Sequence, residues 1–195
     1  MLKLKMKTDP RWVELAENNI KEVMTDHAFC EQKAASNAIS MIVKFPEQSE
    51  LVKEMSALVQ EEMQHFNMVH EKILERGWTL GPERKDDYVN KLGAFFQKGG
   101  SRTQQLVNRL LIAAMIEARS CERFKTLSEN IKDPELASFY YELMKSEAGH
   151  YTMFIGLARK YGDPEGINVN QLWEQFLEFE GELIGQYGRK ETIHG

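Results

Sequence analysis

The chain has 195 residues, of which 42% are hydrophobic and 28% charged, and its formal net charge at pH 7 is −5. These values fit one globular domain with a sizeable core, exclude a general electrostatic attraction to nucleic acid, and leave only local basic patches for such a partner. Two cysteines without a Cys-x-x-Cys pair argue against a disulfide scaffold, a zinc ribbon or a rubredoxin module.

The sequence gives no indication of secretion or of a membrane span. The basic start MLKLKMKTDP is not followed by an apolar segment, as a signal peptide would require. No apolar run approaches the roughly 20 residues that a transmembrane helix needs. We therefore expect a cytoplasmic protein that has no membrane partner.

Helical periodicity characterises the segments between a few proline and glycine positions, and strand signals are nearly absent. The breaks are typical helix boundaries, for example Phe45-Pro46, Gly99-Gly100 and Asp133-Pro134, the last of which reads as an N-cap followed by a first-turn proline. The expected helices are residues 11–45, 47–76, 102–131, 134–161 and 168–187.

The lengths of the connections predict the topology. Short turns join the first helix to the second and the third to the fourth, so each pair forms an antiparallel hairpin. About 25 residues, 77–101, separate the two hairpins and have room for a short helix of their own. Two hairpins joined by one long crossover are typical of ferritin-like bundles. We therefore predict one all-α domain over residues 1–195: a ferritin-like four-helix bundle with an additional amphipathic C-terminal helix, which packs on the bundle or on another subunit.

Ferritin-like bundles build a two-metal site from a glutamate on each of two helices and a Glu-x-x-His motif on each of the other two. The motif occurs here as Glu62/His65 in EEMQH and as Glu147/His150 in SEAGH. In both helices the motif lies within the apolar stripe, where a carboxylate or imidazole needs a partner or a metal ion to offset its desolvation. A third match, Glu191-Thr-Ile-His194, lies in a polar tail and is interpreted as chance.

The other two helices must each supply one glutamate on the core face. In the first helix, Glu31 is the acid centred on the apolar stripe. The third helix offers Glu117 and Glu122. At about 100° per residue, Glu117 lies within about 40° of its apolar neighbours, whereas Glu122 points about 140° away. Glu117 also lies 13 residues before Asn130, as Glu147 lies 13 after Pro134, so the two are level along the hairpin. We choose Glu117 and keep Glu122 as the minority alternative.

Four carboxylates and two imidazoles with open positions suit iron, with manganese as an alternative, and match a closed structural zinc site poorly. His27, one turn before Glu31, is either a contact of that ligand or an ordinary buried histidine. A metal-free bundle whose acids and histidines pair with each other remains the structural alternative. The predicted ligands are Glu31, Glu62, His65, Glu117, Glu147 and His150.

Four stretches resemble one enzyme family over nearly the whole chain: HAFCEQKAAS, EEMQHF, IEARSCERF and SEAGHYTMF. They are similar to the tRNA hydroxylases that act on 2-methylthio-N-isopentenyladenosine beside the anticodon. The resemblance implies a non-haem di-iron monooxygenase that hydroxylates the isopentenyl group with dioxygen and with electrons from an external donor of the ferredoxin or reductase type. It also implies that the six predicted ligands hold two iron ions.

An acidic protein can bind tRNA only through local positive charge. The candidates near the flexible Gly99-Gly100 pair are Lys98, Arg102 and Arg109, and the N-terminal cations Lys3, Lys5, Lys7 and Arg11 are a second group. Arg119 and Arg123, close to Glu117, are expected to pair with neighbouring acids instead.

Two other classes of function stay open. A ferritin-like or rubrerythrin-like protein would handle iron or reduce peroxide, although the missing Cys-x-x-Cys module and the long fifth helix fit this class less well. A metal-free helical interaction module is the third possibility. The oligomeric state, which separates a storage cage from an enzyme, is open.

Overall fold

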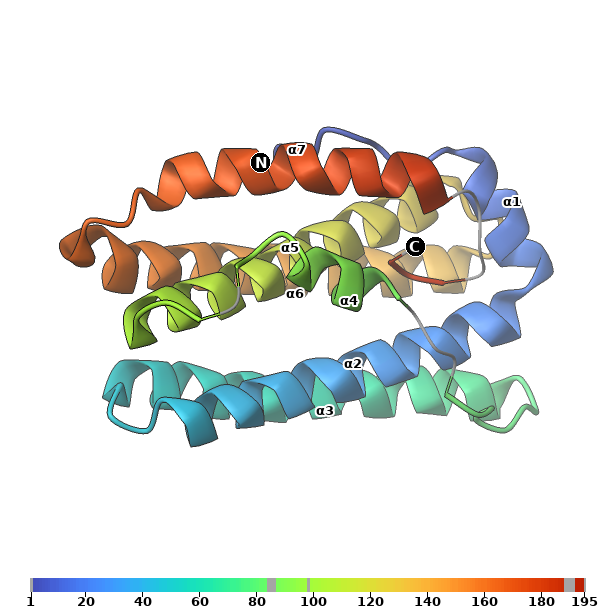
Figure 1. The fold of residues 1–195 in the computed structure, drawn as a ribbon. Helices are drawn as coiled ribbons and strands as arrows, with labels where there is room; N and C mark the ends of the chain where they lie inside the picture. Colours follow the sequence, from blue (N-terminus) through green and yellow to red (C-terminus); the bar gives the residue numbers. More distant parts are fainter. Residues whose placement is uncertain (1, 84–86, 98, 188–191, 195) are drawn as a thin grey trace. The chain divides into compact units, whose positions relative to one another are not determined.

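The computed structural model describes residues 2–83, 87–97, 99–187 and 192–194. Within these residues every regular element is helical, with seven α-helices, one short 3-10 helix and no strand, which confirms the all-α prediction (Figure 1). None of the described helices is both long and apolar enough to cross a bilayer. The described residues fall into two compact units, one holding residues 16–83 and 192–193 and the other the remainder. The prediction of a single domain stays a prediction.

The smaller unit is a hairpin of α2 (Ile20–Lys44) and α3 (Ser49–Glu75), which pack along each other (Figure 1). The turn between them carries the predicted Phe45-Pro46 break, and Phe45 is buried there. The side chains that α3 buries recur every three or four residues, as in the predicted stripe. They are Leu51, Met55, Leu58, Glu62, His65, Val69 and Ile73.

The predicted helix 11–45 is wrong in one respect, because the chain forms two helices there. α1 (Arg11–Asn18) ends one residue before α2 begins, and Asn19 between them has φ −131° and ψ 37°, outside the helical region. Asparagine side chains compete with the helical hydrogen bonds of the backbone, and two asparagines in a row favour a break. The apolar periodicity continues across Asn18-Asn19, which is why it did not reveal the break.

The larger unit contains the second hairpin, α5 (Arg102–Asn130) and α6 (Pro134–Gly162). Both helices begin with a side-chain cap. Ser101 Oγ accepts a hydrogen bond from the backbone N–H of Gln104, and the Asp133 carboxylate accepts hydrogen bonds from the N–H groups of Glu135 and Leu136. The predicted N-cap at Asp133-Pro134 is therefore confirmed.

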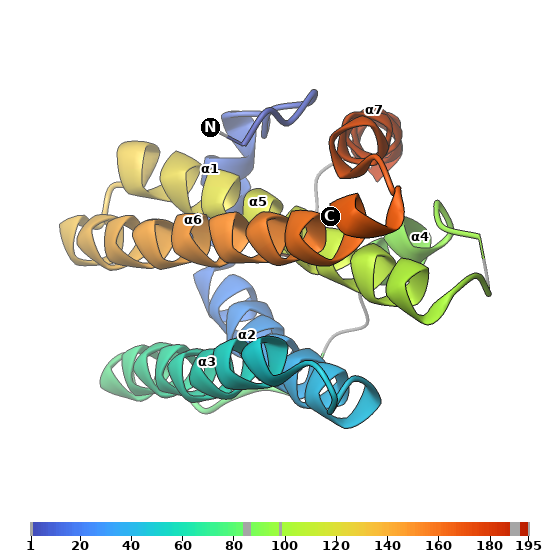
Figure 2. The same ribbon diagram turned by 90° about the vertical axis from the view of Figure 1, so that its left-hand side faces the viewer.

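The crossover and the C-terminal helix complete this unit. The crossover contains the expected short helix, α4 (Tyr88–Gly93), and α7 (Val169–Tyr187) follows a 3-10 turn at Asp163–Glu165 (Figure 2). α7 contacts both α5 and α6, which confirms the first of the two packing alternatives for this helix. Aromatic rings from the crossover and from α7 contact one another in one cluster: Phe95, Phe96, Trp173, Phe176 and Phe179.

Two glycines of α6 are expected to respond in opposite ways to the same substitution. A Cβ at Gly162 would lie 2.6 Å from Cγ2 of Val169 and 3.1 Å from Cγ2 of Val107, both on stiff β-branched side chains, whereas a Cβ at Gly156 would meet nothing within 4 Å. Gly162→Ala should therefore lower the free energy of unfolding by about 1–3 kcal/mol, and Gly156→Ala should raise it by about 0.5–1 kcal/mol. Urea denaturation of both variants measures this, and a Gly162→Ala variant at least as stable as the unaltered protein would contradict the packing at Gly162.

Candidate metal centre

The α2/α3 hairpin brings together three predicted ligands, Glu31 of α2 and Glu62 and His65 of α3. Each offers a ligand atom, and these atoms lie within 4.8 Å of one another. His65 Nδ1 is 3.5 Å from Glu62 Oε2 and 3.8 Å from Glu31 Oε2. The three residues are only 5%, 1% and 7% exposed. Two buried carboxylates and an imidazole in this geometry could bind a metal ion.

His27 contacts one of these predicted ligands directly. It lies one turn before Glu31 on α2, is fully buried, and its Nε2 is 2.6 Å from Glu31 Oε1. Of the two interpretations left open by the sequence, this geometry favours the contact with the ligand. A hydrogen bond of this kind fixes one carboxylate oxygen and so orients the other.

The carboxylates and imidazoles of this group favour one another's charged forms. Burial disfavours the charged form of Glu31, but its contacts with His27 and His65 outweigh that effect and hold the pKa of Glu31 well below its usual range. Burial likewise opposes a charged His65, yet the neighbouring carboxylates of Glu31 and Glu62 raise the pKa of His65 to about 10. Because a ligating imidazole is neutral, binding of a metal ion here would release this proton.

The α5/α6 hairpin carries the other three predicted ligands, Glu117 on α5 and Glu147 and His150 on α6. They are 4%, 2% and 6% exposed. Glu117 and His150 each offer a ligand atom, and these two atoms lie within 4.8 Å of each other. Glu147 lies one turn before His150 on the buried face of α6. Each unit thus buries glutamate and histidine side chains that could hold a metal ion.

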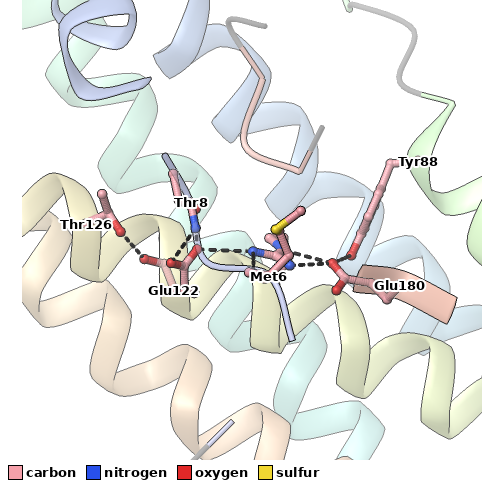
Figure 3. A network of polar contacts seen from close by, with 7 residues as sticks. Met6, Thr8, Tyr88, Glu122, Thr126 and Glu180 are labelled. Carbon is pink, nitrogen blue, oxygen red and sulfur yellow. Dashed lines mark hydrogen bonds and ion pairs between the residues drawn. The ribbon is translucent and has the colours of Figure 1, made fainter. Parts of the chain in front are cut away.

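The alternative ligand Glu122 has different partners. Its carboxylate accepts hydrogen bonds from the backbone N–H of Thr8, at 2.8 Å, and from the Thr8 hydroxyl (Figure 3). It also accepts a hydrogen bond from Arg119 Nη1 at 3.2 Å. These contacts tie Glu122 to the N-terminal segment and support Glu117 as the ligand, although the ligand set itself stays a prediction.

A buried ion pair joins α5 and α7, and the sequence did not predict it. Arg119 donates to Glu180 Oε1 from Nη2 at 2.6 Å and from Nε at 2.9 Å, and the Tyr88 hydroxyl donates to the same oxygen at 3.0 Å (Figure 3). All three side chains are fully buried. Burial, together with the charge of Glu180, raises the pKa of Tyr88 well above its usual value. The expected pairing of Arg119 with a neighbouring acid is therefore confirmed for Glu122, and Glu180 of α7 is a second partner.

We expected Arg123 to pair with an acid, but its contact in the structure is with an aromatic ring. Its guanidinium lies over the ring of Trp12, 4.2 Å from the ring centre, and is almost fully buried. Burial, reinforced by the nearby charge of Arg119, lowers the pKa of Arg123 to about 10. The contact that the structure assigns to this arginine is a cation–π contact with α1.

The expectation of a polar C-terminal tail is wrong for residues 192–194, because all three are buried. His194 Nε2 is 2.9 Å from Ser120 Oγ, and the imidazole stacks on the ring of Tyr88 with ring centres 5.6 Å apart. Glu191 lies outside the described residues. His194 therefore packs against a hydroxyl and an aromatic ring of its own unit. This packing role agrees with the interpretation of the Glu191/His194 match as chance.

The candidate RNA contacts are less well supported. Lys98 lies outside the described residues, Arg102 is exposed at the first position of α5, and Arg109 is half-buried on the same helix. Three of the four N-terminal cations form surface ion pairs: Lys3 with Glu174, Lys5 with Glu178 and Arg11 with Asp9.

The fold and the buried donors together define a ferritin-like helical protein with groups that could bind a metal ion. A solved structure from Synechococcus, described as protein 43 with aldehyde deformylating oxygenase activity, has the same fold, with a TM-score of 0.87, 33% identity and coverage of 98% of this chain and 94% of that chain. This likeness confirms the predicted fold class.

The sequence also matches the tRNA-(MS[2]IO[6]A)-hydroxylase (MiaE) family over residues 2–195, and the chain belongs to that family. Two relatives carry the name tRNA 2-(methylsulfanyl)-N(6)-isopentenyladenosine(37) hydroxylase. The one from Pseudomonas putida is 39% identical over 160 residues, covering 82% of this chain and 77% of the relative. The one from Salmonella typhimurium is 27% identical and covers 96% of this chain and 85% of the relative.

Proposed function

We propose that this chain is a non-haem di-iron monooxygenase that hydroxylates the isopentenyl group of 2-methylthio-N-isopentenyladenosine next to the tRNA anticodon. The observation that carries the proposal is the family membership over residues 2–195, because both named relatives act on this nucleoside. The burial of a glutamate or a Glu-x-x-His motif on each of four helices supports the metal chemistry.

The proposed ligands to iron are Glu31, Glu62, His65, Glu117, Glu147 and His150. Their donors fit iron, because carboxylates and imidazoles together suit Fe(II) and no thiolate is among them. When bound, two irons would supply, with dioxygen and two electrons, the oxidant for a C–H bond of the isopentenyl group. The chain contributes the rest: His27 orients Glu31, and the burial of all six side chains keeps water from the donors.

The partners follow from this chemistry. The substrate is a tRNA, and the electrons come from an external donor of the ferredoxin or reductase type, since the chain has no Cys-x-x-Cys module of its own. Both the substrate and the donor agree with a cytoplasmic location.

The experiment combines iron-loaded protein, a chemical or protein reductant, isotopically labelled dioxygen and tRNA that carries the methylthio-isopentenyl modification. The expected product is the same nucleoside with one labelled oxygen atom on its isopentenyl group, detected by mass spectrometry after digestion. Iron oxidation or peroxide reduction without this product, in a protein that assembles into a many-subunit cage, would contradict the proposal and favour the ferritin-like alternative.

A further inference from the structure

In the larger unit, residues of the crossover loop, α5 and α7 line one cavity. The cavity there has a volume of about 400 Å³, within the range of small-molecule and nucleobase pockets. The side chains that give it its chemistry are Phe95, Phe96, Gln97, Gln104, Asn108 and Gln175.

The backbone of the loop gives the cavity its shape. Gly99 and Gly100, which both line it, have φ values of 94° and 85°, in the region that favours glycine. A Cβ at Gly100 would approach Cγ of Gln104 to 3.3 Å, so a larger residue would also crowd the wall of the cavity. On the other side, Phe95 stacks on Phe176 of α7 at 4.9 Å between ring centres, which holds the aromatic wall in place.

The lining combines aromatic faces with carboxamides and contains no acid or base among the described residues. A carboxamide presents a donor and an acceptor side by side, as the edge of a nucleobase does, and aromatic rings stack on bases. Gln104 Nε2 donates to Asn108 Oδ1 at 2.7 Å, which fixes the two amides relative to each other without using the oxygen of Gln104 or the nitrogen of Asn108.

The electrostatics of this region suit RNA better than the net charge of −5 suggests. The chain has 30 acidic residues, and none of those that the structure describes lines the cavity. α5 begins here, so the positive end of its dipole lies beside the cavity, and Arg102 is exposed in its first turn. A phosphate next to a base in the cavity would therefore not be repelled.

We propose that this cavity binds one unstacked nucleobase of the RNA substrate. The proposal rests on the proposed function and adds a second point of recognition to it. Asn108 precedes the predicted ligand Glu117 by nine residues on the same helix, which corresponds to about 14 Å along its axis. We place in the cavity a base other than the one that is hydroxylated, so that it contributes to binding and register instead of chemistry.

The test compares two exposed glutamines of α7 that lie one turn apart. Gln175 lines the cavity, and Gln171 does not. The probe is an anticodon stem-loop RNA without the hypermodification, and its Kd is measured by fluorescence anisotropy at fixed salt. Gln104→Ala/Gln175→Ala should weaken binding roughly tenfold, and Phe96→Ala by a similar factor, because a paired base edge and a stacked base each contribute at about this level. Gln171→Ala should bind as the unaltered protein does.

Steady-state hydroxylation of modified tRNA separates the two proposals. The double variant should raise KM for tRNA by about the same factor as Kd. If the unaltered protein hydroxylates tRNA but the double variant keeps its affinity for the stem-loop, the cavity proposal fails and the proposed function stands. A rise in KM for the electron donor, with RNA affinity unchanged, would instead assign the cavity to the donor protein. If the unaltered protein neither binds nor hydroxylates tRNA, both proposals fail.

Discussion

Glu117→Ala is expected to lose iron and to lower tRNA hydroxylation by more than about 100-fold, whereas Glu122→Ala should keep both its iron and most of its activity. Glu117 is 4% exposed, with a ligand atom within 4.8 Å of one from His150, and changes to groups that merely touch metal ligands already cost 10–100-fold. Glu122 instead holds Thr8 and Arg119.

The two substitutions should also differ in stability. Glu122→Ala removes charge-assisted hydrogen bonds to Thr8 and Arg119, and we expect the free energy of unfolding to fall by about 1–3 kcal/mol. Glu117→Ala leaves those hydrogen bonds in place, so its apoprotein should not lose their contribution to the free energy of unfolding. Iron content, measured by mass spectrometry of the purified metal-loaded proteins, and urea denaturation of the apoproteins give the two readouts.

Equal iron loss in both variants, with both folded, would overturn the choice of Glu117 as a ligand. Glu71→Ala serves as the control, because Glu71 is an exposed glutamate of α3, two turns beyond the predicted ligands of that helix, and should change neither quantity.

Arg119→Met is expected to cause the largest loss of stability of any single substitution discussed for this chain. Removing the guanidinium leaves the carboxyl group of Glu180, which is 0% exposed, without its cationic partner, and breaking a buried pair in this way costs about 3–5 kcal/mol. For a chain of this length that corresponds to a fall in Tm of roughly 6–20 °C. Glu122 and the carbonyl of Met6, which also accept from Arg119, lose a donor as well.

A surface ion pair and a double variant serve as controls for the Arg119→Met prediction. Lys145→Met breaks a surface ion pair with Glu142 in which the two side chains are 50% and 61% exposed, and it should change stability by less than about 1 kcal/mol. Arg119→Met/Glu180→Leu removes both buried charges and should recover most of the loss, because an apolar pair avoids the desolvation of an unpaired charge. Differential scanning calorimetry measures all three, and a double variant less stable than Arg119→Met would show that the charge of Glu180 is compensated by other groups.

The sequence by itself determined the features that depend on local spacing. Apolar residues at steps of three and four predicted the buried face of α3, and every position of that stripe, including Glu62 and His65, is buried. The N-cap at Asp133 and the starts of α5 and α6 also follow from neighbouring residues, because caps and turns depend on side chains within a few positions of the helix end.

The tertiary structure alone decided which distant side chains meet. The partner of Arg119, Glu180, lies 61 residues further along the chain, and nothing in the local pattern joins the two. A signal did exist for Glu180 itself, since it occupies the apolar face of α7 with Trp173, Phe176 and Leu177, all buried. A charge in that position needs a partner, but periodicity does not say which one.

The same limit explains the other differences. The break at Asn19 interrupts a helix without interrupting its apolar period, the burial of His194 depends on Ser120 and Tyr88, and the cavity beside Gln175 forms from three separate segments. Periodicity records which face of each helix avoids water. The choice among partners on that face is made only when the helices pack, because hydrogen bonds and ion pairs require distances that sequence spacing does not contain.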